Sequence, residues 1–280
     1  MYIQVIPFSH SLSIMPFTYS VPPVWEVSVV LWWLVEIPFW KMMDHGIIVS
    51  ISWEQEHPHD PVLIRPIERV IASVKILAPY QIQCIFLIAQ RYLIPIHRVL
   101  KIFLPTPLMT RLEKKNYILL SGEKGVHPEI QYSIIHAKNH PFSSDFLSKY
   151  CTIGSVLIFP DDYFLYSFLD HMPANMRYFS SESSPVQKSK FWIDVYEGNI
   201  PILVWTRRLL YYNLSHYTHI YYIEDAFWDE EYQYPSRIRN LDTLRCIANQ
   251  NQIQITILTS TPTLELFAKF RDFEIHTSHV

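Results

Sequence analysis

The run Ile200-Pro-Ile-Leu-Val-Trp-Thr-Arg-Arg-Leu-Leu-Tyr-Tyr212 sets the fold class of the C-terminal half of the chain. Two further apolar runs follow: His219-Ile-Tyr-Tyr-Ile223, which ends in Glu224-Asp225, and Ile253 to Leu258, which ends in Thr259-Ser260-Thr261. Three apolar strands that each end in polar residues suit a parallel α/β sheet whose site lies at the carboxyl ends of the strands.

A nucleotide-hydrolysing sheet of this kind also needs a G-x-x-x-x-G-K-[ST] loop, because backbone N–H groups must cradle the phosphates. The sequence has no such segment. Its five glycines are Gly46, Gly122, Gly125, Gly154 and Gly198. The sequence therefore predicts no ATPase chemistry and no bound cofactor.

The pattern of elements predicts a mixed fold in two domains. Residues 1–105 contain short strand-like segments punctuated by prolines, and then helical patterns over 66–76 and 79–100. We expect a small β-rich, β-barrel-like domain with helices there. Residues 106–150 are weakly patterned and are interpreted as a linker or remnant. From residue 151 to 280 strands and helices alternate, which predicts an α/β domain with a parallel sheet.

Composition limits the function classes. The net charge of −3 gives no global basic field for nucleic acid, so any DNA binding must be local. The apolar stretch from Val27 to Trp40 is shorter than the roughly 20 residues of a membrane span. The three cysteines form neither a C-x-x-C pair nor a zinc cluster. With no basic segment before an apolar core at the N-terminus, we expect a cytoplasmic protein with no membrane partner.

Spaced matches in the first 105 residues resemble the primosomal replication-restart helicase family, PriA or primosomal protein N′. They comprise Val5-Ile-Pro7, Pro16-Phe-Thr-Tyr19, Val21-Pro22, Ile37-Pro-Phe39, Gly46-Ile-Ile-Val49, Arg65-Pro-Ile-Glu-Arg-Val-Ile71 and the closing Ala89, Tyr92, Pro95, Val99 and Leu104-Pro105. The resemblance implies the N-terminal 3′-DNA-binding domain of that family. As a set these matches are specific, whereas no single element would be.

The second half is similar to the first, RecA-like helicase lobe of the same family in a degenerate form. Trp205-Thr206-Arg207 resembles the G-T-R motif, Glu224-Asp225-Ala-Phe227 stands at the D-E-E-H box, and Ser260-Thr261-Pro262 stands at S-A-T-P. The box needs an Asp for magnesium and a Glu for water, but here the acidic order is reversed and the last two residues are apolar. The phosphate loop, the middle winged-helix region, the second lobe and the zinc insert of the family are also missing. The resemblance thus implies a shared lobe fold without shared ATPase chemistry.

The candidate DNA-binding residues are Phe17, Thr18, Tyr19, Trp40, Lys41 and Arg65. Trp40 replaces a family glycine next to the pocket and would either block it or add a stacking face, and Lys41 either contacts a phosphate or is only solvated. Phe17 and Tyr19 would stack on the 3′-terminal nucleotide, a contact worth roughly 1–3 kcal/mol per base. Thr18 replaces the usual family Asp at the 3′-OH contact, and Arg65 would neutralise a phosphate. The alternative is that Phe17 and Tyr19 are alternating strand residues, one of them in the core.

Other chemistry-bearing pairs are less specific. His57-Pro-His59-Asp60 and His216-x-x-His219 lack further ligands at metal-site spacing, so we expect no metal. Asp161, Asp162 and Asp225 suggest a nuclease, but no lysine-paired acidic motif accompanies them.

The sequence thus predicts a PriA-like DNA-binding protein for replication restart. Its partners would be forked or primer 3′ ends and other primosome or replication proteins. We expect no ATPase activity of its own. The alternatives left open are a helicase subunit completed by a partner chain and a metal-dependent DNA nuclease.

Overall fold

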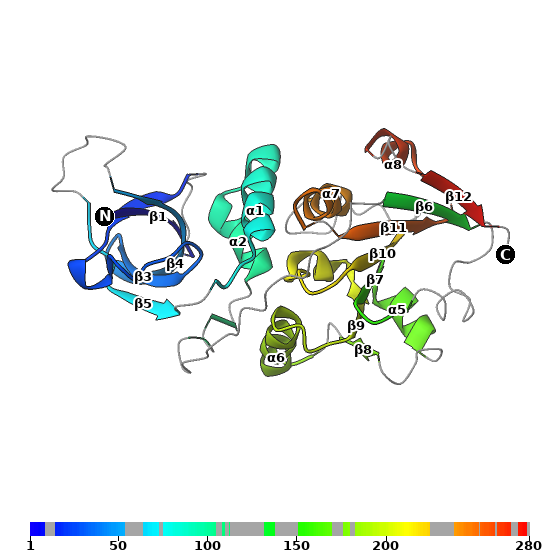
Figure 1. Cartoon of the computed structure of the whole chain (residues 1–280), viewed down its shortest axis with the longest axis horizontal. Coiled ribbons are helices and arrows are strands. Elements are labelled where there is room, and N and C mark those ends of the chain that lie inside the picture. Colours follow the sequence, from blue (N-terminus) through cyan, green and yellow to red (C-terminus); the bar gives the residue numbers. More distant parts are fainter. Residues whose placement is uncertain are drawn as a thin grey trace. The chain divides into compact units, whose positions relative to one another are not determined.

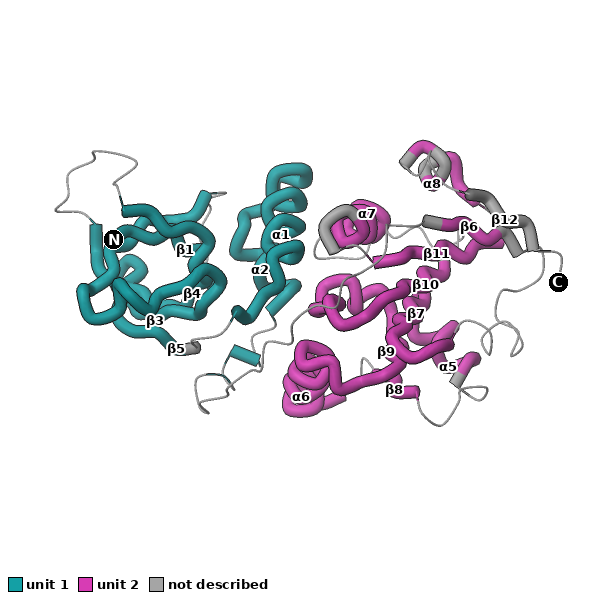
Figure 2. The backbone as a smooth tube through the Cα atoms, viewed as in Figure 1, with its two compact units in different colours: residues 1–121 teal, residues 122–280 magenta. Residues whose placement is uncertain are grey.

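The computed structural model describes residues 1–8, 15–53, 64–72, 75–104, 108–109, 112, 132–137, 151–169, 176–179, 183–224, 238–251, 253–260, 262–269 and 274–278. The chain divides into two compact units (Figure 2), here called the N-terminal unit, Met1–Ser121, and the C-terminal unit, Gly122–Val280.

The N-terminal unit is built on a five-stranded antiparallel sheet in the order β2-β1-β4-β3-β5 (Figure 1). The strands are β1 (Tyr2–Pro7), β2 (Phe17–Ser20), β3 (Leu34–Phe39), β4 (Met42–Ser52) and β5 (Arg69–Ala72). β1 pairs with both β2 and β4, while β3 pairs with β4 and β5. Register shifts at Gln4/Val5 and Leu34/Val35 bend the strands, as bulges do in barrels.

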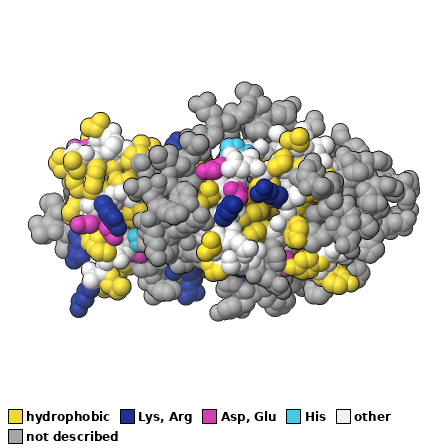
Figure 3. Space-filling model, turned by 90° about the horizontal axis from the view of Figure 1, so that it is seen from below, with side chains coloured by type: hydrophobic (Ala, Val, Ile, Leu, Met, Phe, Trp, Pro, Cys, Tyr) yellow, Lys and Arg dark blue, Asp and Glu magenta, His cyan; other side chains and the backbone are white. Residues whose placement is uncertain are grey.

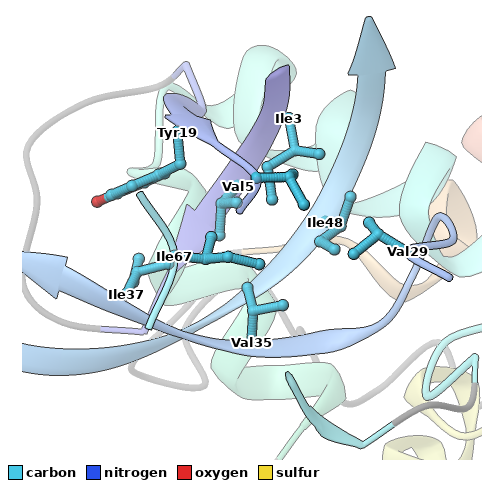
Figure 4. Packing of buried hydrophobic residues seen from close by; sticks show 9 residues of the cluster. Ile3, Val5, Tyr19, Val29, Val35, Ile37, Ile48 and Ile67 are labelled. Carbon is cyan, nitrogen blue, oxygen red and sulfur yellow. The ribbon is translucent and has the colours of Figure 1, made fainter. Parts of the chain in front are cut away.

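Backbone bonds connect the two ends of this sheet, so it curls upon itself. The amide of Ser20 in β2 donates to the carbonyl of Arg65 at 3.0 Å, and the amide of Ile67 donates to the carbonyl of Ser20 at 3.0 Å. The enclosed core contains Ile3, Val5, Tyr19, Val21, Val29, Val35, Ile37, Ile48 and Ile67 (Figure 4). These pairings confirm the expected β-rich domain. Closure of the sheet pairs strand edges that an open sheet would leave without partners.

Two helices complete the N-terminal unit, α1 (Pro79–Tyr92) and α2 (Ile96–Phe103). The helical pattern expected over 79–100 is therefore two helices, and the break falls at Leu93, which has a φ of 51°. The helix expected over 66–76 is wrong. This segment contains β5, which pairs with β3 and is tied to it by the Arg69–Glu36 ion pair at 2.6 Å.

The C-terminal unit contains a seven-stranded sheet in the order β12-β6-β11-β10-β7-β9-β8. Its strands are β6 (Tyr132–Ala137), β7 (Ser155–Phe159), β8 (Arg177–Tyr178), β9 (Ile202–Thr206), β10 (His219–Glu224), β11 (Gln254–Thr259) and β12 (Glu274–Ser278). All described pairings in it are parallel. The predicted parallel α/β sheet is confirmed, and with it the mixed fold class.

The sheet begins earlier in the chain than expected. β6 lies inside the 106–150 segment interpreted as a linker or remnant, yet it pairs with β11 and β12. The Ser133 and Thr256 hydroxyls are 2.9 Å apart across the β6–β11 pair. The separation into units falls at 121/122 instead of at 105 and 151. A strand recruited by distant partners leaves little local signal.

Helices α5 (Asp162–Leu169), α6 (Pro185–Tyr196), α7 (Asn240–Asn251) and α8 (Leu264–Lys269), with the 3₁₀ helix η3 (Arg207–Tyr211), connect these strands (Figure 1). The start of α6 is capped by Ser184, whose hydroxyl accepts from the Gln187 amide while the Gln187 side chain accepts from the Ser184 amide, a capping box. Within the described ranges, no helix is long and apolar enough to cross a membrane.

Candidate nucleic-acid interface

An aromatic cluster lies where β2 meets the far end of β3. Phe17 and Tyr19 are two residues apart on β2 and so share one face of the strand. The Phe17 ring meets Phe39 edge-on, with centroids 5.2 Å apart. The Tyr19 hydroxyl donates to the carbonyl of Pro38 at 3.3 Å. We call this end of the sheet, next to the β3–β4 turn, the barrel mouth.

Tyr19 is both a core residue and a mouth residue. Its side chain is 5% exposed and belongs to the core cluster, as the alternative interpretation required of one aromatic. Its hydroxyl nevertheless extends away from Val5 and Ile48 (Figure 4). Phe17 is half-buried and packs against the same cluster. Of the two predicted stacking residues, Phe17 is the more accessible.

Thr18 lies on the other side of the strand. Side chains alternate between faces along β2, and the burial pattern follows this, with Thr18 exposed between half-buried Phe17 and buried Tyr19. A side-chain hydroxyl on the outer face is poorly placed to share a ligand with the two rings. Its assignment to the 3′-OH contact, drawn from the resemblance, stays a prediction that this geometry does not favour.

The β3–β4 turn places an indole at the rim of the mouth. Trp40 and Lys41 form the two-residue loop between the paired residues Phe39 and Met42. Trp40 is 81% exposed and has a φ of 55°. Two-residue hairpins need positive φ at such positions and favour Gly, Asn or Asp there. A bulky residue held in this region costs of order 1–3 kcal/mol, and such strain concentrates at functional sites.

Arg65 holds this turn. Its Nη1 donates to the Trp40 carbonyl at 3.0 Å, although the side chain is exposed. A guanidinium has five N–H donors, so one bond to a carbonyl leaves donors with which to contact a phosphate. Lys41 is exposed on the same turn. The structure thus brings Phe17, Tyr19, Trp40, Lys41 and Arg65 to one end of the sheet.

An acidic residue that sequence reasoning missed also lies here. The pKa of Tyr19 is raised to about 12, mainly by burial. The Asp44 carboxylate also acts to raise this pKa, and the Arg65 guanidinium acts to lower it. Asp44 is half-buried and pairs with Ile37 across β3–β4. Strand alternation places Asp44, Gly46 and Ile48 on one face of β4, but that this face is the inward one follows from the register of β4 against β3.

In the C-terminal unit, three of the residues that the resemblance assigns to helicase motifs lie at one edge of the sheet. Thr206 ends β9, Glu224 ends β10, and Ser260 directly follows β11. The register places Glu224 opposite Thr259 and Phe159 of β7 opposite Thr206. The predicted gathering at the carboxyl ends is therefore seen for these three positions. Asp225 and Thr261 lie outside the described residues.

Arg207 does not present its charge to solvent at this edge. It is 8% exposed, and its Cζ lies 6.0 Å from the centroid of the buried Tyr222 ring, within cation–π range. A phosphate contact at Arg207 is therefore not favoured, whereas Arg208 is exposed.

The other candidate groups have structural partners. The Asp161 carboxylate accepts from the Phe164 amide at 2.9 Å at the start of α5. His216 Nε2 is 2.9 Å from the Tyr196 carbonyl, and His219 bonds to Gln254 and Thr256. In the described part of the chain, no group of three or more His, Cys, Asp or Glu could hold a metal ion. The segment with His57, His59 and Asp60 lies outside that part.

Surface charge is mixed. On the face drawn in Figure 3, basic, acidic and hydrophobic side chains are interspersed over the described surface. This agrees with the net charge of −3 and with the expectation that any nucleic-acid contact is local.

Comparison with known proteins supports the N-terminal resemblance. Residues 6–105 match the family model of the PriA 3′DNA-binding domain (3′BD). A crystal structure of the Pyrococcus furiosus Hef helicase domain is similar at a TM-score of 0.35 and 14% identity. That similarity covers 54% of this chain and 35% of the Hef chain. A search of curated proteins gave no match. The resemblance inferred for the N-terminal residues is thus confirmed, and residues 6–105 are similar to the PriA 3′DNA-binding domain.

Proposed function

We propose that the N-terminal unit binds the 3′ end of a DNA strand at the barrel mouth, and that the protein acts at forks or primer ends in replication restart. The observation that carries this proposal is the convergence of Phe17, Tyr19, Trp40 and Arg65 at one end of a domain matched by the 3′DNA-binding model. The aromatic rings can stack on a base, and the arginine can neutralise a phosphate.

Each residue has a distinct task in the proposal. The half-buried Phe17 ring, which packs edge-on with Phe39, contacts the terminal base. The hydrogen bond from the Tyr19 hydroxyl to the Pro38 carbonyl holds the Tyr19 ring in place beneath it. Trp40 gives an exposed face on which an adjacent base stacks. Arg65 and Lys41 supply positive charge for one or two phosphates. Thr18, on the outer face, contributes less than the resemblance implies.

The C-terminal unit is proposed to be a degenerate helicase lobe that serves as a scaffold or protein-interaction surface. Three of the five glycines have structural positions away from the carboxyl edge of the sheet: Gly46 in β4, Gly154 before β7, and Gly198 after α6. Gly122 and Gly125 do not form the motif that cradles a triphosphate. We therefore propose that the chain does not hydrolyse ATP, and other replication proteins remain candidate partners.

The test of DNA binding uses fluorescent primer–template DNA with the full chain. Phe17→Ala should weaken binding to a free 3′ end by roughly 1–3 kcal/mol and leave binding to blunt duplex nearly unchanged. Arg65→Ala should weaken both and lower the salt slope by about one phosphate contact. Lys190→Ala, at an exposed position of α6, is the matched basic control. An equal loss for Phe17→Ala on both substrates would reject the mouth as the binding site.

The ATPase proposal is tested by phosphate release with and without fork DNA. We expect none above background. A DNA-stimulated rate above about 1 per second that Asp225→Asn abolishes would contradict it and favour the helicase alternative.

A further inference from the structure

The helical part of the N-terminal unit is basic, although the chain as a whole is not. Residues 69–112 contain no Asp or Glu, and their six Lys or Arg side chains are Arg69, Lys75, Arg91, Arg98, Lys101 and Arg111. The whole chain has a net charge of −3. An asymmetry of charge within one chain indicates that the basic part has an acidic partner.

Helix α2 carries two of these charges on its outer side. Its buried residues are Ile96, His97, Val99, Leu100 and Phe103. Arg98 is exposed and Lys101 is half-buried. Because they are three residues apart, they lie one turn apart on the same side of the helix. α2 therefore directs two cations away from the core of the unit.

Helix α1 packs against α2 (Figure 1) and exposes a stripe without negative charge. Gln83, Leu87, Gln90 and Arg91 are exposed, and their spacings of three and four residues place them on one side of the helix. Arg91 lies in the last turn of α1 and Arg98 in the first turn of α2, so both lie beside the short turn that joins the helices. We call the surface made by Gln83, Gln90, Arg91, Arg98 and Lys101 the α1–α2 face.

The chemistry of this face suits the backbone of a nucleic acid. Arg, Lys and Gln side chains all donate hydrogen bonds, and they are among the groups that contact phosphate and sugar in protein–DNA complexes. A helix that binds a lipid surface leaves its apolar side open to the membrane, whereas the apolar sides of α1 and α2 are buried within the unit. Leu87 and Leu93 are exposed, but single apolar side chains on a surface are common.

We propose that the α1–α2 face binds the phosphate backbone of duplex DNA. The choice of DNA among acidic partners rests on the proposed function, because the same unit is proposed to take a 3′ end at the barrel mouth. The mouth selects the end of the strand. The α1–α2 face adds affinity for the duplex that depends on charge and not on base sequence.

The experiment measures the affinity of the full chain for blunt duplex DNA and for a single strand with a free 3′ end, over a series of salt concentrations. Arg98→Ala/Lys101→Ala should bind the duplex more weakly, with a salt slope lower by about two phosphate contacts. Each contact contributes about 0.9 to that slope, so between roughly 50 and 200 mM salt the wild-type protein should lose about tenfold more affinity than the variant. Binding of the single strand should change little.

Two double variants are the controls. Arg98→Lys/Lys101→Arg keeps both charges and should bind the duplex as the wild-type protein does. Lys188→Ala/Lys190→Ala removes one half-buried and one exposed charge from α6 of the C-terminal unit and should leave the salt slope unchanged. Thermal melting checks the folding of each variant. If Arg98→Ala/Lys101→Ala is not folded, the exposed single variant Arg98→Ala replaces it, with a slope lower by about one contact.

An unchanged salt slope in the folded variant, or an equal fall in the α6 control, overturns the inference. Loss of binding to anionic lipid vesicles with unchanged duplex affinity also overturns it, in favour of a lipid surface. Phe17→Ala, measured on the same two DNAs, separates this inference from the proposed function. If Phe17→Ala weakens both DNAs equally, the mouth fails as the site of the 3′ end, whereas a lower salt slope in Arg98→Ala/Lys101→Ala still supports the α1–α2 face.

Discussion

Gly46 is the position where the packing of the N-terminal unit is most sharply defined, and Gly46→Ala tests it. An alanine Cβ would lie 2.3 Å from Val5 Cγ1, 3.0 Å from the Ile6 carbonyl oxygen and 3.3 Å from Ile37 Cδ1. Val5 and Ile37 are fully buried, and Val5 is stiff at χ1 because it is β-branched. Neither neighbour can move aside without displacing the core.

The expected net effect is destabilisation by about 2 kcal/mol. Overpacking a core costs typically 1–3 kcal/mol, whereas replacing glycine gains only about 0.4–1 kcal/mol by restricting the unfolded chain. The clash at 2.3 Å is below any ordinary carbon–carbon contact, so the cost should lie in the upper part of that range. Urea unfolding followed by fluorescence should show a lower midpoint with an unchanged slope.

The double variant Val5→Ala/Gly46→Ala supplies the control. Removing the Val5 methyl groups makes room for the new Cβ, so the double variant should be more stable than the sum of the single effects by at least about 1 kcal/mol. Strict additivity, or a Gly46→Ala protein as stable as the wild type, would refute this account of the packing.

Three further outcomes are expected. Gly198→Ala should destabilise the C-terminal unit in thermal melting, because Gly198 has a φ of 71° and a Cβ would lie 2.8 Å from His216 Cγ. Burial lowers the pKa of His219, so its contribution to stability is present above the unfolded pKa of about 6.5 and is lost as pH falls below it; His219→Gln should flatten that part of a stability–pH curve. A fragment of residues 1–121 should melt cooperatively and at a higher temperature than 1–105, since the unit extends to 121; a fragment without a melting transition would contradict the independence of the unit.

Elements with a strong local signal could be predicted from the sequence. Val156 to Phe159 is a continuous apolar run, and with Ser155 it forms β7. Helix α6 carries its own start signal, because Ser184 and Gln187 form a capping box and Pro185 stands at the start of the helix. Runs of this kind carry their own periodicity or turn chemistry, so no distant partner is needed to recognise them.

Elements that are defined by distant partners could not be predicted from the sequence. Arg69–Ala72 is short enough to fit a helix or a strand, and its pairing with β3 decides the matter. β6 depends on β11, more than a hundred residues away. At the barrel mouth the aromatic residues could be named in advance. The inward position of Asp44 could not, because it follows from the register of β4 against β3.

The central claim is that a free 3′ end, and not duplex or branched DNA in general, is what the N-terminal unit recognises. The most direct measurement is the affinity of the full chain, at one salt concentration, for a fork with a free 3′-OH at the junction and for the same fork carrying a 3′-phosphate there. The account predicts clearly tighter binding to the free hydroxyl. Equal affinities would contradict it and would leave Phe17 and Tyr19 as residues of the core.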